Sequence, residues 1–203
     1  MTTPSSDVAF SLAVKAVQTR HRSREAYAEM EAKGGFRTLV DEQLSATLAE
    51  ANSAYLVTAS AIGQPYAQHR GGPKGFIRVV DDHTLAFADY RGNRQYISTG
   101  NLAENPKAFL FLMDYANRRR IKVWGRARRV EDDTDLIFRL MPDGYKARSE
   151  AVILFEIEAW DTNCPQHIPQ KFEAADVAGA MEHLNRRISE LEAENAELKG
   201  RLT

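Results

Sequence analysis

Several features are scarce in this sequence of 203 residues, and each scarcity excludes a class of protein. A single cysteine cannot form an internal disulfide bond, so the fold must depend on a buried apolar core, which a chain of this length can provide. No apolar run approaches the roughly 20 residues that span a bilayer. The first residues, MTTPSSDVAF, lack the basic and then apolar layout of a secretory signal. We therefore expect a cytoplasmic protein with no membrane-embedded part.

The sequence also lacks an excess of charge of either sign. Lysine and arginine number 27 against 28 aspartate and glutamate residues, which gives a formal net charge of -1. Long-range attraction of the whole molecule to nucleic acid is therefore not expected. The hydrophobic fraction of 43% is too high for intrinsic disorder. Any binding of anions must be local.

The spacing of apolar residues divides the chain into three segments, predicted at residues 1–53, 54–171 and 172–203. The first reads as helical from residue 10 to about 51. The second has a period near two, with a helix predicted at 133–141. Its β-rich runs are 55–59, 76–80, 84–88, 109–113, 121–130 and 152–159. These patterns predict a mainly β protein with flanking helices (α+β), whose strands form a barrel.

The third segment has the most regular spacing in the chain. Its apolar positions and one asparagine alternate three and four residues apart: Met181, Leu184, Ile188, Leu191, Asn195, Leu198 and Leu202. This is the a and d series of a coiled coil, and Asn195 at an a position favours two parallel strands. In a parallel pair Arg187 faces Glu192 and Glu194 faces Lys199, so both flanking pairs attract. The alternative is an amphipathic helix packed on its own domain.

A basic stretch lies in the middle segment, with Arg118, Arg119, Arg120, Lys122, Arg126, Arg128 and Arg129 close together. On a strand, Ile121, Val123 and Ala127 point to one face and the even-numbered cations to the other, with Trp124 among them. This cationic face is compatible with a solvated surface, a site for a phosphorylated aromatic cofactor or substrate anion, or stacking of single-stranded nucleic acid.

Two further clusters supply hydrogen-bond donors. The first is Asn93, Arg94 and Gln95 after Gly92, and the second is Gln68, His69 and Arg70 before Gly71 and Gly72. The first directly precedes a helical stretch that Pro106 closes, and donors at the start of a helix form an anion site. The second is placed at the end of a strand, where the paired glycines allow close approach of a ligand to the backbone.

The order of these motifs resembles that of the pyridoxamine 5'-phosphate oxidase-like flavoproteins, which have an FMN-binding split β-barrel. The resemblance covers about residues 55 to 130 and depends on GQPY, FADYRGNRQ, NLAENPKAFLFL and RRRIKVWGRARRV in that order. It implies bound FMN and a homodimer in which both subunits build each flavin site. By position, it implies cofactor contacts from Gln68, His69, Arg70, Gly71, Ala88, Asp89, Arg94, Gln95 and Arg120. Asn93 joins Arg94 at the helix start as a further phosphate donor.

The sequence departs from the oxidase pattern at several points. Gln95 stands where the oxidases have a lysine, and WDTNCPQHIPQKF stands in place of a closing tryptophan and arginine signature. Pyridoxamine phosphate is therefore not the expected substrate. Cys164 and His167, with Gln166 between them, follow the last strand, where a loop can lie against a cofactor. No oxyanion donors accompany Cys164 and His167 as a nucleophile and base, and their spacing with His69 does not indicate a metal site.

Two classes of function remain from this reading. The first is an FMN-dependent oxidoreductase that acts on an unknown small substrate, in which the flavin is the reactive group and no catalytic side chain is required. The alternative is a non-catalytic FMN-binding or sensing module whose zipper helix recruits a partner. Nucleic-acid binding through the basic strand is a third and less favoured interpretation, and a deazaflavin could take the place of FMN.

Overall fold

The computed structural model describes residues 3–162 and 165–201. Contacts divide the chain into two compact units, one of Met1–Asp114 with Arg119–Gln166 and the other of Tyr115–Arg118 with His167–Thr203. The first unit contains the strands and the helices α1 to α5, and the second contains the long helix α6. Each unit is described by itself below.

The first unit is built on a seven-stranded antiparallel sheet with the order β2-β1-β5-β6-β7-β4-β3. The strands are β1 Ser53–Ala59, β2 Pro65–Gly71, β3 Arg78–Val79, β4 Thr84–Tyr90, β5 Lys107–Asp114, β6 Arg119–Val130 and β7 Ser149–Thr162. Each of the six predicted runs contains or overlaps a strand. The run 76–80 contributes only the two residues of β3, because Phe76 and Ile77 are buried in the core. The six predicted runs do not include β2, because its polar residues obscure the alternation of apolar residues that is typical of a strand.

The sheet curls until its two ends approach each other. Four strands separate β2 from β4 in the sheet order, yet Arg70 of β2 forms an ion pair with Asp89 of β4. A flat sheet would hold these side chains about 24 Å apart, because β2 and β4 are five spacings of 4.7–4.9 Å from each other. The sheet is therefore a barrel that remains split between β2 and β4, and the predicted fold class is confirmed.

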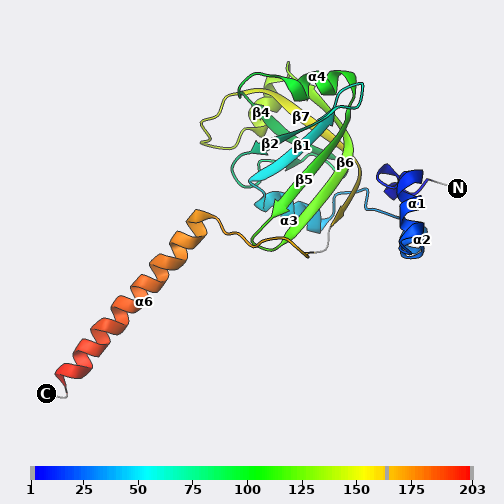
Figure 1. Ribbon diagram of the computed structural model, residues 1–203. Helices are drawn as coiled ribbons and strands as arrows, with labels where there is room; N and C mark the ends of the chain where they lie inside the picture. Colours follow the sequence, from blue (N-terminus) through cyan, green and yellow to red (C-terminus); the bar gives the residue numbers. More distant parts are fainter. Residues whose placement is uncertain (1–2, 163–164, 202–203) are drawn as a thin grey trace. The chain divides into compact units, whose positions relative to one another are not determined.

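The inside of the barrel is apolar and closed at both ends by helices. Leu56, Phe87, Leu110, Val123 and Phe155 are fully buried along the inner faces of five strands. Helix α4 (Ile97–Glu104) lies across one end and α3 (Glu42–Glu50) across the other (Figure 1). Helix α5 (Thr134–Leu140) packs on the outer face of β4 and β7. The segment predicted at 133–141 thus forms the expected helix.

A β-bulge between β6 and β7 depends on Gly125. The register of the two strands shifts between Trp124 and Gly125, which increases the local twist of the sheet. A Cβ atom at Gly125 would lie 1.9 Å from the carbonyl oxygen of Glu156. No other residue fits there without displacement of β7, so this glycine is required for the curl of the barrel.

The N-terminal segment contains the short helix η1 (Ser5–Val8), α1 (Leu12–Arg20) and α2 (Arg24–Ala32), as the sequence predicts. The chain after α2 is fixed to the barrel by Trp160, whose indole Nε1 donates to the carbonyl oxygen of Leu39 at 2.7 Å. Phe36 stacks on Trp124, with ring centroids 5.2 Å apart and planes 6° from parallel. One face of Trp124 is therefore covered by Phe36.

The second unit is mainly helix α6, Ala174–Gly200. In the segment before it, Gln170 donates from Nε2 to the carbonyl oxygen of Ala116 at 2.8 Å. The ammonium of Lys171 lies 4.5 Å from the ring centroid of Tyr115. No residue of α6 is buried within the described chain. Within that same part of the chain, no helix combines the length and the apolar character needed to cross a membrane.

Candidate functional site

A small hollow of about 50 Å³ lies at the split of the barrel, between β2, β4, the turn after β4 and the start of α4. Strand β2 contributes Tyr66, Gln68 and Arg70 to it. These three residues pair with Thr58, Leu56 and Ala54 of β1, whose side chains are buried inside the barrel. Because alternate residues of a strand share a face, β2 directs its polar side chains inward at the place where the sheet is open.

The turn from β4 to α4 forms the second wall of the hollow. Arg94 and Tyr96 both have left-handed backbones, with φ of 64° and 53°. The amide of Gln95 donates to Oδ1 of Asn93 at 3.2 Å, which fixes the turn. Tyr96 is the N-cap of α4 and forms no side-chain cap. Within the described chain, the N–H groups of the first helical turn, at Ile97 and the two residues after it, have no partner and line a site with partial positive charge.

Arg94 presents its guanidinium at the mouth of this turn. Its Nε donates to the Tyr96 hydroxyl at 3.3 Å, and that hydroxyl donates to Glu150 at 3.3 Å. The hydrogen bond from Arg94 to Tyr96 raises the pKa of the guanidinium further above its ordinary value, so Arg94 is always charged. Within the described chain, the two terminal nitrogens of Arg94 have no partner, and they form a fork that suits a phosphate.

A nearly buried cluster of charged side chains, Arg70, Asp89 and Arg129, lies beside the hollow. Asp89 accepts from Arg70 on one oxygen and from Nε of Arg129 at 2.7 Å on the other. The side chains of Arg70, Arg129 and Asp89 are only 11%, 9% and 12% exposed. Nε of Arg70 is buried without a hydrogen-bond partner among the described residues. A buried donor without an acceptor is unfavourable by itself, so this atom indicates where a ligand oxygen or nitrogen would bind.

Two neutral side chains complete the lining. Gln68 accepts a hydrogen bond from the buried Ser98 hydroxyl at 2.7 Å, which directs its amide group to the hollow. The amide nitrogen of Gln68 has no partner within the described chain and remains a donor. Burial, followed by the nearby Tyr145, raises the pKa of the Tyr90 phenol above its ordinary value of 10.0. Tyr90 is therefore neutral at physiological pH.

The charged residues that line the hollow balance: Arg70 and Arg94 are cations, and Asp89 and Glu150 are anions. Both oxygens of Asp89 are occupied by Arg70 and Arg129, whereas the terminal nitrogens of Arg94 have no partner within the described chain. The fork of Arg94, together with the helix N-terminus, therefore favours an anion.

The structure brings together six of the ten predicted site residues. Those lining the hollow are Gln68, Arg70, Asp89, Asn93, Arg94 and Gln95. Asp89 lies there as the acceptor that holds two arginines, and its two oxygens are both occupied.

Three more predicted residues, His69, Gly71 and Ala88, lie close by but do not line the hollow. His69 points to the outer face of β2, where its Nε2 is 3.0 Å from the Ser53 hydroxyl. Ala88 is buried on the face of β4 opposite to Asp89. Its backbone lies beyond the end of β3, which pairs only with Leu85 and Ala86.

Glycines at the end of β2 are explained by packing. A Cβ atom at Gly72 would lie 2.7 Å from Cβ of the buried Phe76, and one at Gly71 would lie 3.0 Å from the ring of His69. The chain needs small residues here to seat Phe76 in the core, which is a different reason from the close approach of a ligand that the sequence predicted.

Arg120 lies far from the other predicted site residues of its own chain. It lies nine residues before Arg129 on β6, which corresponds to about 30 Å at the rise of a β-strand. Arg129 itself contacts Asp89 at the hollow. Like Arg70, Arg120 has a buried Nε with no partner in the described part of the chain. Arg120 cannot join the hollow of its own chain.

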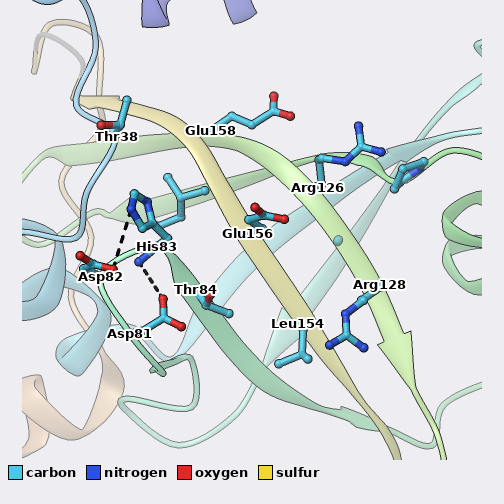
Figure 2. Close-up of a pocket in the computed structure, with 13 residues that line it drawn as sticks. Thr38, Asp81, Asp82, His83, Thr84, Arg126, Arg128, Leu154, Glu156 and Glu158 are labelled. Carbon is cyan, nitrogen blue, oxygen red and sulfur yellow. Dashed lines mark hydrogen bonds and ion pairs between the residues drawn. The ribbon is translucent and has the colours of Figure 1, made fainter.

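A second hollow of about 910 Å³ lies on the outer face of β6 and β7. Figure 2 shows Arg126 and Arg128 on one strand and Glu156 and Glu158 on the other, with Asp81, Asp82 and His83 of the loop before β4 to their left. Its charged lining is Arg126 and Arg128 against Asp81, Asp82, Glu156 and Glu158, beside His83. Carboxylates exceed arginines by two. This hollow is larger but repels an anion, so it does not suit a phosphorylated ligand.

Sequence reasoning missed several residues of the site. These are Tyr66, Tyr90, Tyr96, Ser98, Arg129 and Glu150. Tyr66 would have followed from identifying β2 as a strand, since it lies two residues before Gln68. Tyr90, Tyr96 and Ser98 flank the turn with Arg94 in the sequence. Arg129 and Glu150 carry no such signal, because β6 and β7 bring them to the site.

Cys164 lies outside the described residues, and so does Leu202 of the predicted seam. His167 has a left-handed backbone with φ of 61°. Among the residues that the structure describes, no group of three or more histidine, cysteine, aspartate or glutamate side chains is arranged to hold a metal ion.

Comparison with known proteins identifies relatives by sequence and by fold. Two curated proteins named pyridoxine/pyridoxamine 5'-phosphate oxidase, from Cupriavidus taiwanensis and Cupriavidus necator, are each 32% identical over 110 residues. These residues are 54% of this chain and 48% of each relative. The chain thus spans about half the length of the curated relatives it matches. A crystal structure of HupZ from Group A Streptococcus is 19% identical with a TM-score of 0.49, and the match covers 66% of this chain and 100% of that one.

The family assignment comes from a match to the family described as pyridoxamine 5'-phosphate oxidase, which extends over residues 40–164. The matched region contains all seven strands, the turn with Arg94 and the helix α4. It thus includes every motif on which the resemblance in the sequence depends. This chain belongs to the pyridoxamine 5'-phosphate oxidase family.

Proposed function

We propose that this protein is an FMN-dependent oxidoreductase that acts on a small-molecule substrate, as a homodimer with each flavin bound between two barrels. The observation that carries the proposal is the hollow at the split of the barrel. There the free guanidinium fork of Arg94, an uncapped helix start and the unpartnered Nε of Arg70 converge.

The phosphate of FMN fits the donors at the turn. It carries close to two negative charges, and the turn offers Arg94 together with the first N–H groups of α4. The hollow of about 50 Å³ is much smaller than the whole of FMN. The rest of the cofactor would therefore extend over the surface beside the turn and need a second wall.

The flavin ring needs hydrogen bonds at its polar edge and apolar cover over its faces. A donor is available from the amide nitrogen of Gln68, which has no partner within the described chain. When bound, FMN would supply the chemistry of the reaction, the transfer of hydride or electrons, while side chains of the protein position it. This division of labour explains why no side chain at the hollow is arranged as a nucleophile with its base.

The second wall is proposed to come from a partner subunit. The outer face of the sheet over β1, β5 and β6 presents Tyr55, Phe109, Phe111 and Trp124 as an aromatic surface, with Phe109 and Phe111 stacked 6.1 Å apart. Tyr55 is 38% exposed. Arg120 ends this surface, about 30 Å from the hollow of its own chain. Pairing two barrels through this face would cover it and would bring Arg120 of one subunit to the flavin of the other.

The absorption spectrum of the freshly purified protein tests cofactor binding. We expect a yellow protein with the two visible bands of an oxidised flavin, and mass spectrometry of the released chromophore distinguishes FMN from a deazaflavin. A colourless protein that remains colourless after incubation with FMN would contradict the proposal.

Reduction kinetics then test enzymatic activity. Rapid bleaching of the bound flavin on mixing with NADH or NADPH, followed by reoxidation on addition of an acceptor, supports an oxidoreductase. A flavin that stays bound and oxidised with both donors would instead support a non-catalytic FMN-binding or sensing module, which has the same fold and the same hollow.

A further inference from the structure

Helix α6 carries an apolar stripe that no part of the described chain covers. Along Ala174–Gly200 the stripe residues Val177, Met181, Leu184, Ile188, Leu191 and Leu198 are between 42% and 60% exposed. An isolated helix gains little from such residues, since water surrounds them. A continuous apolar stripe on a helix of 27 residues indicates a surface that another helix covers.

The spacing of the stripe selects the kind of partner. Ala174 and Val177 precede Met181 and Leu184 by one heptad, so the a and d series fills the whole helix from its first residue. A strict seven-residue repeat is the signature of a coiled coil, whereas packing on a globular domain produces a wider stripe with a period of 3.6. Asn195 is the one polar residue at an a position among the described residues, which favours a parallel pair of two strands.

The charges beside the stripe select a second copy of the same chain. In a parallel, in-register pair, Arg187 at position g meets Glu192 of the partner at position e, and Glu194 meets Lys199 in the same way. Both contacts attract, and symmetry repeats each on the other side of the seam. Within one helix Arg187 pairs with Glu190 at 3.0 Å, so an interhelical partner would extend an existing ion pair.

We propose that α6 forms a parallel, two-stranded, in-register coiled coil with α6 of a second copy of this chain. This interaction surface is independent of the flavin site. It joins the two chains through residues outside the matched family region 40–164. Two barrels tethered in this way would stay paired at concentrations where a barrel interface alone would dissociate.

Disulfide trapping in the full chain tests the orientation and the register. With Cys164→Ser as background, Leu198→Cys places a thiol at a d position near the end of the helix. In a parallel pair the two copies face each other within disulfide reach. Ala193→Cys at an outer f position is the matched control, where the copies lie on opposite outer faces. We expect oxidation to trap the Leu198→Cys dimer faster than the control by on the order of tenfold or more.

An antiparallel pair gives a distinct result. Because an antiparallel pair places an a residue opposite a d residue, it would bring Leu198 of one chain opposite Ala174 of the other and would separate the two copies of Leu198 by about 36 Å. A mixture of Ala174→Cys and Leu198→Cys chains would then form the mixed dimer in preference to either homodimer. That outcome, or equal trapping at Leu198→Cys and Ala193→Cys, would overturn the proposal.

Charge reversal provides a second test that does not depend on thiols. Arg187→Glu alone creates repulsion across the seam, and combining it with Glu192→Arg restores the attraction. Residues five apart do not face each other on one helix, so rescue in the double variant must come from the partner chain. The melting temperature of the helical circular dichroism signal depends on protein concentration for a dimer. We expect this temperature to fall in the single variant and to recover in the double one. Failure of the double variant to recover would contradict the proposed register.

Discussion

The two hollows of the barrel both place arginines beside carboxylates, and they differ in how these side chains are held. At the split, Arg70, Asp89 and Arg129 form a buried ion cluster, and one buried donor of that cluster remains without a partner. On the outer face, Arg126 and Glu156 are exposed cross-strand neighbours, and no ion pair joins them within the described chain. The charged side chains of the smaller hollow are held in buried ion pairs, whereas Arg126 and Glu156 of the larger one are exposed to solvent.

This difference shows that volume alone does not identify a binding site. Long side chains in water lose rotational freedom when they grip a ligand, which reduces the net binding free energy. Arginines already fixed by a buried carboxylate do not incur that loss a second time. The hollow at the split is therefore the better anion site although its volume is about 50 Å³ against 910 Å³.

The largest expected effect is on stability. Asp89→Ala removes the acceptor shared by two nearly buried arginines, which leaves Arg70 without its ion pair and Arg129 with Glu131 alone, and this should lower the free energy of unfolding by about 3–5 kcal/mol. Denaturant unfolding measures the change. The matched control in the outer hollow is Glu156→Ala, expected within about 0.5 kcal/mol of the parent. Equal losses in both variants would show that the two hollows do not differ as described.

A smaller effect is expected on cofactor binding without a change in stability. Arg94→Ala removes the exposed guanidinium fork of the turn and should weaken FMN binding by on the order of 100-fold. Fluorescence titration of the apoprotein with FMN measures the affinity. Arg128→Ala removes an arginine from the outer hollow and should leave the affinity unchanged. An unaltered affinity in Arg94→Ala would exclude the turn as the phosphate site.

The smallest expected effect is a gain in affinity for FMN. Gln95→Lys adds a cation to the phosphate turn and should tighten FMN binding by about threefold to tenfold at low salt. The gain should shrink as the salt concentration rises, since the added charge is exposed. Gln64→Lys, in the turn between β1 and β2, adds the same charge away from the hollow. A similar gain in that control would assign the effect to net charge and not to position.

The sequence predicted the parts of the site that depend on local pattern. The turn with Asn93, Arg94 and Gln95 was identifiable because a glycine and three donors directly precede a helix. The two faces of β6 were identifiable because the residues at 121, 123 and 127 alternate with cations, and the structure buries all three. Both features can be predicted from residues that are close together in the sequence.

The remaining parts depend on the curvature of the whole sheet. The ion pair between Arg70 and Asp89 forms because a sheet of seven strands curls until β2 meets β4. No local pattern encodes that contact. His69 was grouped with Gln68 and Arg70 because β2 was not recognised as a strand over its full length, and the period of two separates it from both. Arg120 was grouped with the others although the length of β6 places it about 30 Å away.

The central claim is that each flavin site takes Arg94 from one subunit and Arg120 from the other. Co-expression of Arg94→Ala chains and Arg120→Ala chains with different affinity tags allows the mixed dimer to be purified. In a shared site, the mixed dimer has one intact site and one site lacking both arginines. We predict about one tightly bound FMN per mixed dimer, and almost none in either homodimer of variants. A mixed dimer without FMN, alongside a fully loaded parent, would contradict the shared site.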